Sequence, residues 1–261
     1  MQGEEEVMDK KLGIGILSTD RPNFLGRLIV SLKKYTETPC DIIVYDDSSI
    51  KKRECRKIAK QLRCSFLDTG KRIGIAKNTN RLLLGLKDYD YKVMFNNDVE
   101  ILKKGWETAY IDAMNKTNIH CFCFRQLGLW GACKEGEDNK KPDKRFEYNN
   151  TELAVIGEYP QGAMLFFDKL THEKVGYYDA ELFKSYGMSH HDWSHRISLS
   201  GIQPKGIYDI GNSNEYLKVY PVESITPFNE KNKIYRINQE LFRKKKIELD
   251  RGLKDIYVEY S

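Results

Sequence analysis

The first hundred residues alternate between short apolar runs and longer segments whose apolar residues have helical spacing. The runs typical of strands cover residues 12–17, 41–45, 65–67 and 93–95. The first two helical segments cover residues 23–35 and 52–62, and a third helix opens from a basic, glycine-bearing turn at residues 70–78 and runs through residue 86. Strands that alternate with helices of this length form a largely parallel sheet with right-handed crossovers. We therefore expect a single α/β domain with a mixed, mostly parallel central sheet flanked by helices, for which 261 residues are sufficient.

Polar side chains follow three of these runs at the points where the strands should end. They form the groups Ser18-Thr19-Asp20-Arg21, Asp46-Asp47-Ser48 and Asn96-Asn97-Asp98. Ligands of parallel sheets bind at the carboxyl ends of the strands, so these groups predict a site along one edge. Carboxylate and amide oxygens suit Mg²⁺ or Mn²⁺ rather than zinc. The alternative for the third group, taken alone, is an ordinary Asn/Asp turn.

A second polar cluster lies between Gly176 and Gly201. It brings His190, His191, Asp192, His195 and Arg196 into seven residues. Helical spacing places Asp192 beside both His195 and Arg196. A desolvated carboxylate can abstract a hydroxyl proton, which makes Asp192 a candidate general base. Two alternatives are a purely structural Asp–Arg pair and a metal site formed by His190 and Asp192.

Composition and glycine spacing narrow the function classes. The net charge of +5 is modest, so it favours a phosphate-bearing ligand without establishing nucleic-acid binding. The chain has no GxGxxG after its first strand and no GxxxxGK[ST]. The dinucleotide-binding and P-loop classes therefore lose their main support.

The cysteines and the termini predict a cytoplasmic protein. The six cysteines form no CxxC pair and have no histidine at zinc-finger spacing, which indicates free thiols in a reducing compartment. The acidic, polar N-terminus is unlike a signal peptide, and residues 1–10 are expected to be a disordered lead. No apolar run approaches the roughly 20 residues needed for a transmembrane segment.

The second half contains clear strands and helices together with two strongly polar segments. Residues 105–116 and 192–199 have helical spacing, and residues 121–124 and 163–167 read as strands. The polar stretch 134–152 is expected to be a surface loop, with a lid over the site as the alternative. Residues 229–261 predict a basic helical tail packed over the sheet, with contact to anionic lipid or DNA as the alternative.

The order of these motifs over residues 11–206 resembles the inverting family 2 glycosyltransferases, which have a GT-A-type fold. The resemblance rests on LSTDRPNFLGRLIVSL, IIVYDDSS, GKRIGIAKNTN, MFNNDVEILKKGW and GYYDAELFKSYGMSHHDWSHRISLSG. It implies one GT-A-type domain over residues 11–228, with a nucleotide-binding half to about 105 and an acceptor and catalytic half from about 106. The segment 229–261 follows as the tail.

The resemblance also implies roles for individual residues. Asp98 occupies the metal-binding position of a DxD-like segment whose first acid is replaced by Asn96, and the ion would be Mn²⁺ or Mg²⁺. The residues expected to bind a nucleotide-sugar donor, with UDP as its nucleotide, are Ser18, Thr19, Arg21, Asp46, Asp47, Arg72, Lys77, Asn96 and Asn97. The catalytic candidates are Asp192, His190 and His191. Asp192 is favoured as base because it is the only carboxylate there, whereas counting back from Arg196 places the base at His190.

The function implied is metal-dependent transfer of a sugar to an acceptor hydroxyl with inversion. The default acceptor is a saccharide or glycolipid, and a protein or a hydroxylated DNA base is the alternative. Two other functions stay open at this point: a nucleotidyltransferase, although the first loop lacks its usual glycines, and an inactive nucleotide-sugar-binding or glycan-binding protein. The sugar and the oligomeric state are left open.

Overall fold

The computed structural model describes residues 11–124, 144–156, 162–184, 187–220 and 228–261. The expected disordered lead, residues 1–10, lies outside these ranges. The strands of the main sheet are β1 (Leu12–Ser18), β2 (Cys40–Asp46), β3 (Ser65–Asp68), β4 (Tyr91–Asn96), β6 (Cys121–Phe124), β7 (Lys144–Tyr148), β8 (Thr151–Ile156), β9 (Met164–Asp168) and β10 (Ile207–Ile210). The helices are α1 (Pro22–Tyr35), α2 (Lys52–Gln61), α3 (Ile75–Gly85), α4 (Trp106–Thr117), α5 (Lys169–Val175), α6 (Ser189–Leu199) and α7 (Phe228–Asp250).

Within the described residues the main sheet has the order β3-β2-β1-β4-β9-β6-β10-β8-β7. Strands β3, β2, β1 and β4 are parallel, whereas β9 runs antiparallel to both of its neighbours, β4 and β6. A separate small sheet pairs β5 (Val99–Ile101) with β11 (Leu217–Val219). The predicted mixed, mostly parallel α/β sheet with flanking helices is therefore confirmed.

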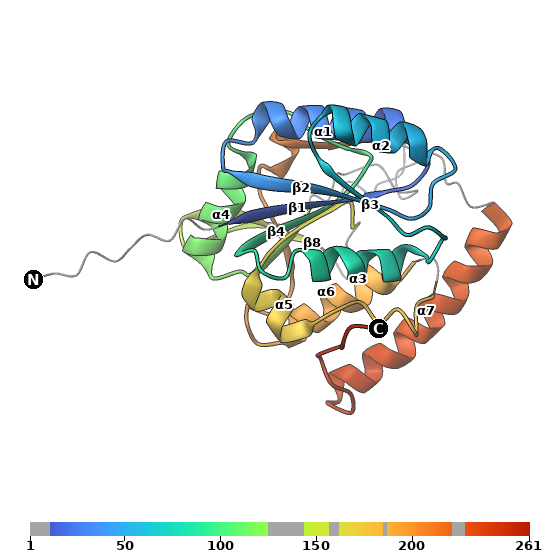
Figure 1. Cartoon of the computed structure of the whole chain (residues 1–261). Coiled ribbons are helices and arrows are strands. Elements are labelled where there is room, and N and C mark those ends of the chain that lie inside the picture. The colour runs from blue at the N-terminus through green and yellow to red at the C-terminus, as the bar shows by residue number, and fades with distance from the viewer. Residues whose placement is uncertain (1–10, 125–143, 157–161, 185–186, 221–227) are drawn as a thin grey trace, which may run out of the picture.

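Helices cover both faces of the sheet (Figure 1). Helices α1, α2 and α4 pack on one face against a cluster that includes Ile14, Ile16 and Phe95. Helices α3, α5 and α6 pack on the other face with Leu17 and Met94. This division follows from the strands themselves, because successive side chains point to opposite faces.

One glycine marks the closest approach of a helix to the sheet. A Cβ atom added at Gly15 of β1 would lie 2.4 Å from Cγ of Leu82 in α3. No real Cβ contact is that short, so α3 can lie this close to β1 only because position 15 has no side chain. This contact holds the second half of α3 directly against the middle of β1.

The polar stretch predicted as a loop is partly a hairpin. Strands β7 and β8 pair in antiparallel register, and Asn149 and Asn150 form their turn with φ of 49° and 56°. Two residues with positive φ are typical of tight hairpin turns. The loop prediction is wrong for residues 144–152, since the polar, exposed face of the hairpin hid its strand pattern, while residues 125–143 lie outside the described ranges.

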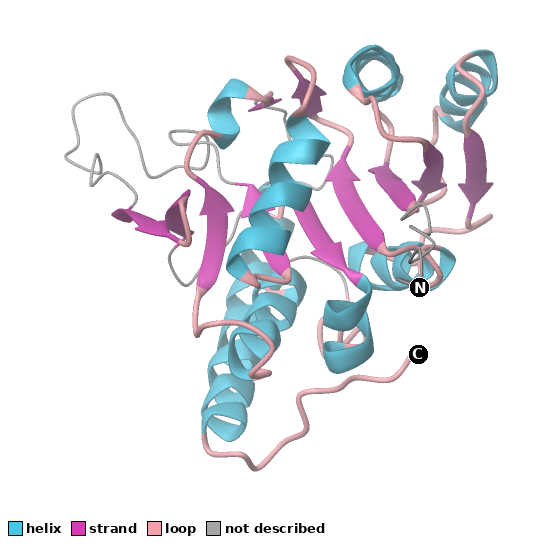
Figure 2. Cartoon of the chain, turned by 90° about the vertical axis from the view of Figure 1, so that its left-hand side faces the viewer, coloured by secondary structure: helices cyan, strands magenta, loops and turns pink. Residues whose placement is uncertain are grey.

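The C-terminal segment forms an outer layer beside α6. Figure 2 shows α7 running along the same side of the sheet as α6, and the two helices are in contact. The helix ends at Asp250, after which the chain is extended and Val258 forms a parallel bridge with Gly176. The prediction of a helical tail is therefore confirmed only as far as Asp250. The tail helix α7 packs against α6.

None of the helices described here is long and apolar enough to cross a bilayer. The boundaries proposed for the nucleotide-binding half, the acceptor half and the tail stay predictions.

Candidate donor and catalytic site

The carboxyl ends of β1, β2 and β4 lie side by side, as the sequence predicted. Ser18 is the register partner of Asp46, and Leu17 is the partner of Asn96. The backbone N–H of Asp47 donates to the carbonyl of Ser18 at 3.1 Å, and the hydroxyl of Thr19 also donates to that carbonyl at 2.8 Å. The three polar groups therefore share one edge of the sheet.

Asp46 and Asp47 shape this edge in different ways. Asp46 is fully buried and accepts the backbone N–H of Ser49 at 2.8 Å, with the Ser49 hydroxyl at 2.5 Å from its second oxygen. Burial raises its pKa despite these hydrogen bonds. Asp47 accepts the backbone N–H groups of Ile73 and Gly74 at 2.7 and 3.0 Å. Asp47 therefore fixes the glycine-bearing turn that opens α3.

The two predicted phosphate-binding cations each have a carboxylate partner. Arg72 lies 3.1 Å from Asp20 and is half-exposed, while Lys77 lies 2.7 Å from Glu181 with both side chains exposed. Exposed ion pairs of this kind contribute only about 0–1 kcal/mol. A phosphate group can therefore compete for Arg72 and Lys77 at little energetic cost.

Asp98 has the features of a metal ligand. Its side chain is buried, and its Oδ1 atom has no hydrogen-bond partner among the described residues. Burial raises the pKa of Asp98, and the positive charge of Arg21 opposes that shift. Arg21, which follows β1, and Asp98, which follows β4, are therefore close enough to interact. Asn97 is also buried, and Asn96 is half-buried at the end of β4.

The donor set fits an ion that is held partly by substrate. Nowhere in the described ranges do three His, Cys, Asp or Glu side chains gather as a metal cluster. Mg²⁺ is commonly bound through one or two carboxylates together with substrate phosphates. Of the carboxylates described at this edge, Asp46, Asp47 and Asp20 have hydrogen-bond or ion-pair partners, whereas Asp98 has an oxygen without a hydrogen bond among the described residues. The unsatisfied oxygen of Asp98 matches such a site, and the amide oxygens of Asn96 and Asn97 are the neutral donors beside it.

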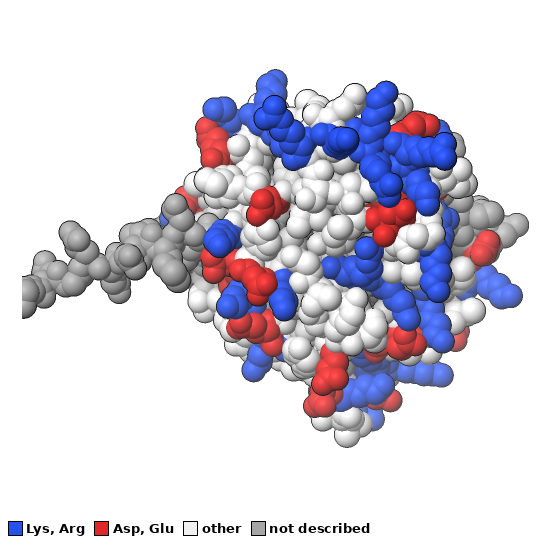
Figure 3. Space-filling model, viewed as in Figure 1, with Lys and Arg blue, Asp and Glu red and all other residues white. Residues whose placement is uncertain are grey.

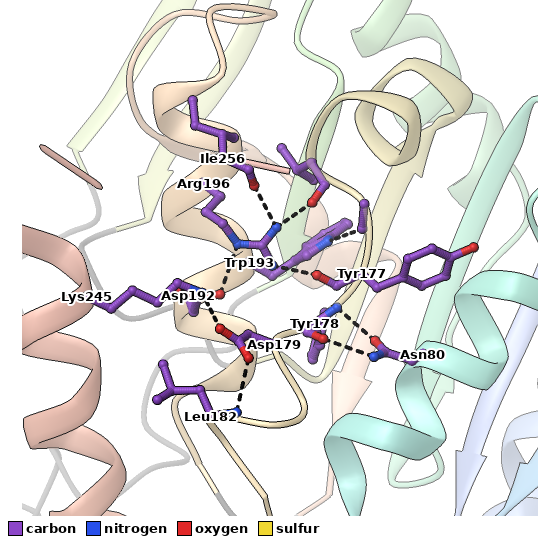
Figure 4. A network of polar contacts seen from close by, with 12 residues as sticks. Asn80, Tyr177, Tyr178, Asp179, Leu182, Asp192, Trp193, Arg196, Lys245 and Ile256 are labelled. Atoms are coloured by element: carbon purple, nitrogen blue, oxygen red, sulfur yellow. Dashed lines mark hydrogen bonds and ion pairs between the residues drawn. The ribbon is translucent and has the colours of Figure 1, made fainter. Parts of the chain in front are cut away.

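Asp192 is enclosed by charge instead of facing the edge. Its side chain is 0% exposed, Arg196 Nε donates to Oδ2 at 2.9 Å, and Lys245 Nζ lies 2.9 Å from Oδ1 (Figure 4). The lysine contact is an ion pair without hydrogen-bond alignment, since Oδ1 has no hydrogen bond to any residue that the structure describes. A general base must reach the proton that it removes. Both oxygens of Asp192 face cations, so the geometry favours the structural alternative for this residue.

Arg196 extends the network to the backbone. It is fully buried and donates to the carbonyls of Val175, Tyr177 and Ile256. These carbonyls belong to the end of α5, the segment after it and the extended C-terminal residues. The Asp192–Arg196 pair thus holds three segments around α6, and the predicted i,i+4 contact is confirmed.

His190 is the member of the cluster that lies toward the edge. It is half-buried, and a Cβ atom added at Gly162 would lie 3.0 Å from its Cδ2 atom. Gly162 precedes β9, and the neighbouring carbonyl of Ala163 accepts the backbone N–H of Asn96 at 2.9 Å. The His190 ring is therefore placed beside the end of β4 that carries Asn96, Asn97 and Asp98.

His191 has a different environment from His190. It is buried beside Phe242, with ring centroids 6.3 Å apart. Burial, together with the neighbouring His190, lowers the pKa of His191 to about 2. An imidazole with so low a pKa stays neutral and is a weak base, so His191 fits packing better than proton transfer.

Sequence reasoning missed Asp179 and Lys245. Lys245 is 4% exposed and lies 2.9 Å from Asp179 Oδ2 as well as from Asp192. It stands in the run Arg243-Lys244-Lys245-Lys246, which reads as a solvated face. Helical spacing could have identified Lys245 as buried, because it lies on the same face of α7 as the buried residues Phe242 and Leu249.

The fold, the edge with Asp98 and the second cluster on α6 define a GT-A-type glycosyltransferase domain. The sequence profile of the family "Glycosyl transferase family 2" matches residues 14–173, more than half of the chain. The chain therefore belongs to glycosyl transferase family 2. This membership favours the glycosyltransferase class over the nucleotidyltransferase alternative.

Solved structures show the same fold at low sequence identity. The mannosyltransferase PcManGT from Pyrobaculum calidifontis, in complex with GDP-Man and Mn²⁺, has a TM-score of 0.54 and 10% identity, covering 75% of this chain and 54% of its own. GalNAc-T7 with UDP, GalNAc and Mn²⁺ has a TM-score of 0.63 and 13% identity, covering 88% and 48%. S. aureus TarS 1-349 in complex with UDP-GlcNAc has a TM-score of 0.59 and 11% identity, covering 88% and 66%.

The chain thus spans about half the length of the first two of these proteins. No curated protein sequence matches it.

Proposed function

We propose that this chain transfers a sugar from a UDP-sugar donor to an acceptor hydroxyl, with inversion at the anomeric carbon and with Mn²⁺ or Mg²⁺ bound at Asp98. The observation that carries the proposal is the buried Oδ1 atom of Asp98, which has no hydrogen-bond partner in the described part of the chain and lies within the field of Arg21. Two of the similar structures contain Mn²⁺ and two contain UDP or UDP-GlcNAc, which supports the choice of ion and nucleotide.

The donor is assigned to the carboxyl edge of β1, β2 and β4. Asp46, Asp47, Ser18 and Thr19 build the part of this edge where the nucleoside is expected. Arg21, Arg72 and Lys77 are the cations that would face the diphosphate. A divalent ion held by Asp98 would neutralise charge on the leaving diphosphate. Arg21, Arg72 and Lys77 would also stabilise the negative charge that develops on the diphosphate in the transition state.

His190 is proposed as the general base. The acceptor oxygen attacks C1 of the sugar, the bond from C1 to the diphosphate oxygen breaks, and its electron pair leaves with the diphosphate. The acceptor proton passes to the neutral imidazole of His190. A single displacement of this kind inverts the configuration at C1. In this proposal Asp192 is a positioning residue for His190. Its ion pairs fix the first turn of α6, which carries both residues.

The acceptor is proposed to be a saccharide or a glycolipid, with a protein or a hydroxylated DNA base as the alternative. A cytoplasmic location is part of the proposal. It is supported by five cysteines of the described ranges (Cys40, Cys55, Cys64, Cys121 and Cys123), all of which are free thiols.

The proposal is tested by thermal shift with UDP, GDP, CDP and dTDP, each with and without Mn²⁺. A ligand that binds only the folded state raises the melting temperature according to its concentration and affinity. We expect a shift with UDP that requires Mn²⁺ and is absent from Asp98→Asn. A shift of equal size for all four nucleotides without metal would refute the donor site. Product from a competent acceptor that keeps the donor's anomeric configuration would refute His190 as base.

A further inference from the structure

Most of the chain's excess positive charge lies on one short segment, α2 with its flanks. Residues 51–63 (KKRECRKIAKQLR) contain seven Lys and Arg and a single Glu, which gives +6 where the whole chain has +5. Figure 3 shows Lys and Arg side chains gathered along the upper edge of the molecule, where α1 and α2 lie in Figure 1. The rest of the chain is thus close to neutral.

The cations of this segment are exposed or half-exposed, and most have no carboxylate partner in the described part of the chain. Lys52 and Arg56 lie 3.3 and 3.6 Å from Asp68. The exposed cations whose side chains have no carboxylate partner among the described residues are Lys51, Arg53, Lys57, Lys60 and Arg63. The surface therefore presents charge that the fold itself does not neutralise.

The spacing of these cations follows one side of the helix. Arg53, Lys57 and Lys60 recur at intervals of three and four residues, which places neighbours about 5–6 Å apart. The opposite side carries Cys55 and Ala59, which are buried against the sheet. Like charges at i and i+4 destabilise an isolated helix, so this row has an energetic cost that a polyanion would remove.

We propose that this surface, residues 51–63, binds the phosphate backbone of a duplex nucleic acid. Guanidinium groups such as those of Arg53 and Arg63 match phosphate oxygens in a bidentate geometry. The ten residues of α2 span about 15 Å, and duplex DNA carries one negative charge per roughly 1.7 Å of axis. The row therefore meets several phosphates at once.

A lipid surface fits these residues less well. A helix that binds a membrane interface turns an apolar face toward the lipid. The apolar residues of α2 point into the protein, and the large apolar side chain exposed beside this row is Ile50, at 92%. The surface thus acts through charge and hydrogen bonds, which suits a polyphosphate backbone.

The surface formed by residues 51–63 lies apart from the proposed catalytic residue His190. It begins next to the candidate donor site, since the backbone N–H of Lys51 donates to Asp20, the partner of Arg72. It lies on the opposite face of the sheet from α6 and His190. A bound nucleic acid would lie beside the candidate donor site without entering the catalytic centre, so this proposal is independent of the acceptor's identity.

The test is fluorescence anisotropy of a labelled 20-base-pair DNA duplex between 50 and 300 mM KCl, with the full chain and a triple variant, Arg53→Gln/Lys57→Gln/Lys60→Gln. Each phosphate contact contributes about 0.9 to the slope of log affinity against log salt. We expect the triple variant to flatten that slope by about 2–3 and to lose at least tenfold in affinity at 50 mM KCl.

The matched control is Arg236→Gln/Arg243→Gln/Lys244→Gln on α7, which removes the same charge from another exposed helix. It should bind the duplex nearly as the unaltered chain does. Equal losses in the two triples, absence of duplex binding at 50 mM KCl, or stronger binding to phosphatidylserine vesicles or polyglutamate than to DNA would each overturn the proposal. Both triples should keep the UDP-dependent thermal shift, so failure here is distinguishable from failure of the proposed function.

Discussion

Lys245 and Asp192 form an ion pair across the interface of α7 and α6, with Nζ 2.9 Å from Oδ1 and almost no solvent contact on either side. The same ammonium group reaches Asp179 at 2.9 Å, and Asp192 is held from its other side by Arg196. Two cations thus face two carboxylates, of which Asp192 is fully buried and Asp179 is partly exposed. Asp192, the base predicted from the sequence, is therefore part of the scaffold that holds α6.

Lys245→Met should destabilise the fold, because it leaves the fully buried Asp192 and the partly exposed Asp179 with one cation fewer. Removing one partner of a buried ion pair costs about 3–5 kcal/mol. We expect a loss of that size in the free energy of unfolding measured with urea. The control is Lys244→Met on the exposed side of α7, which should stay within about 0.5 kcal/mol of the unaltered chain. Equal effects of the two substitutions would contradict the network.

His190→Ala should reduce kcat for sugar transfer by at least about 100-fold, a typical contribution of a general base. Binding of UDP with Mn²⁺, followed by thermal shift, should stay unchanged because His190 is assigned to the acceptor side. Asp192→Asn should instead lower the melting temperature, because Asp192 is part of the buried ion-pair network. An Asp192→Asn variant that melts normally and yet has no activity would return the base role to Asp192.

Asp98→Asn should separate stability from donor binding. Burial raises the pKa of Asp98, so the ionised carboxylate is unfavourable in the folded state without a metal ion. Near pH 7 the substitution should raise the melting temperature of the metal-free protein by a few degrees while abolishing the Mn²⁺-dependent UDP shift. Asp112→Asn, on an exposed position of α4, serves as the control and should change neither quantity. A metal-free melting temperature that falls in Asp98→Asn would contradict the electrostatic argument.

His172→Gln should weaken the acid sensitivity of the fold. Burial beside Lys92 lowers the pKa of His172 to about 4, whereas an unfolded histidine titrates near 6.5. As the pH falls from 6.5 to 4 the unfolded chain binds the proton first, so this residue's contribution to stability is lost over that window. The slope should reach about 1.4 kcal/mol per pH unit. Urea unfolding at pH 7, 6 and 5 measures it, and identical slopes for both proteins would contradict the assignment.

The polar edge of the sheet could be predicted because each of its polar groups directly follows a strand in the sequence. Each of β1, β2 and β4 ends in polar residues directly after an apolar run, and the parallel register then brings Ser18, Asp46 and Asn96 together. The roles within the second cluster could not be predicted in the same way. Asp192 looked accessible because its partner Lys245 lies on a later helix and inside a run of charges. The hairpin of β7 and β8 was missed since only Leu153, Ala154 and Ile156 of its second strand are buried.

The bridge between Gly176 and Val258 has a consequence for the order in which the protein is made. Tyr177 N–H donates to the carbonyl of Val258 at 2.9 Å, and Arg196 binds the carbonyl of Ile256 at 3.0 Å. Domains emerge from the ribosome N-terminus first, so β1, β2 and β4 can pair long before residues 256–258 exist. The nucleotide edge can therefore assemble during translation, while the surroundings of α6 are closed only after residue 258 has been released from the exit tunnel.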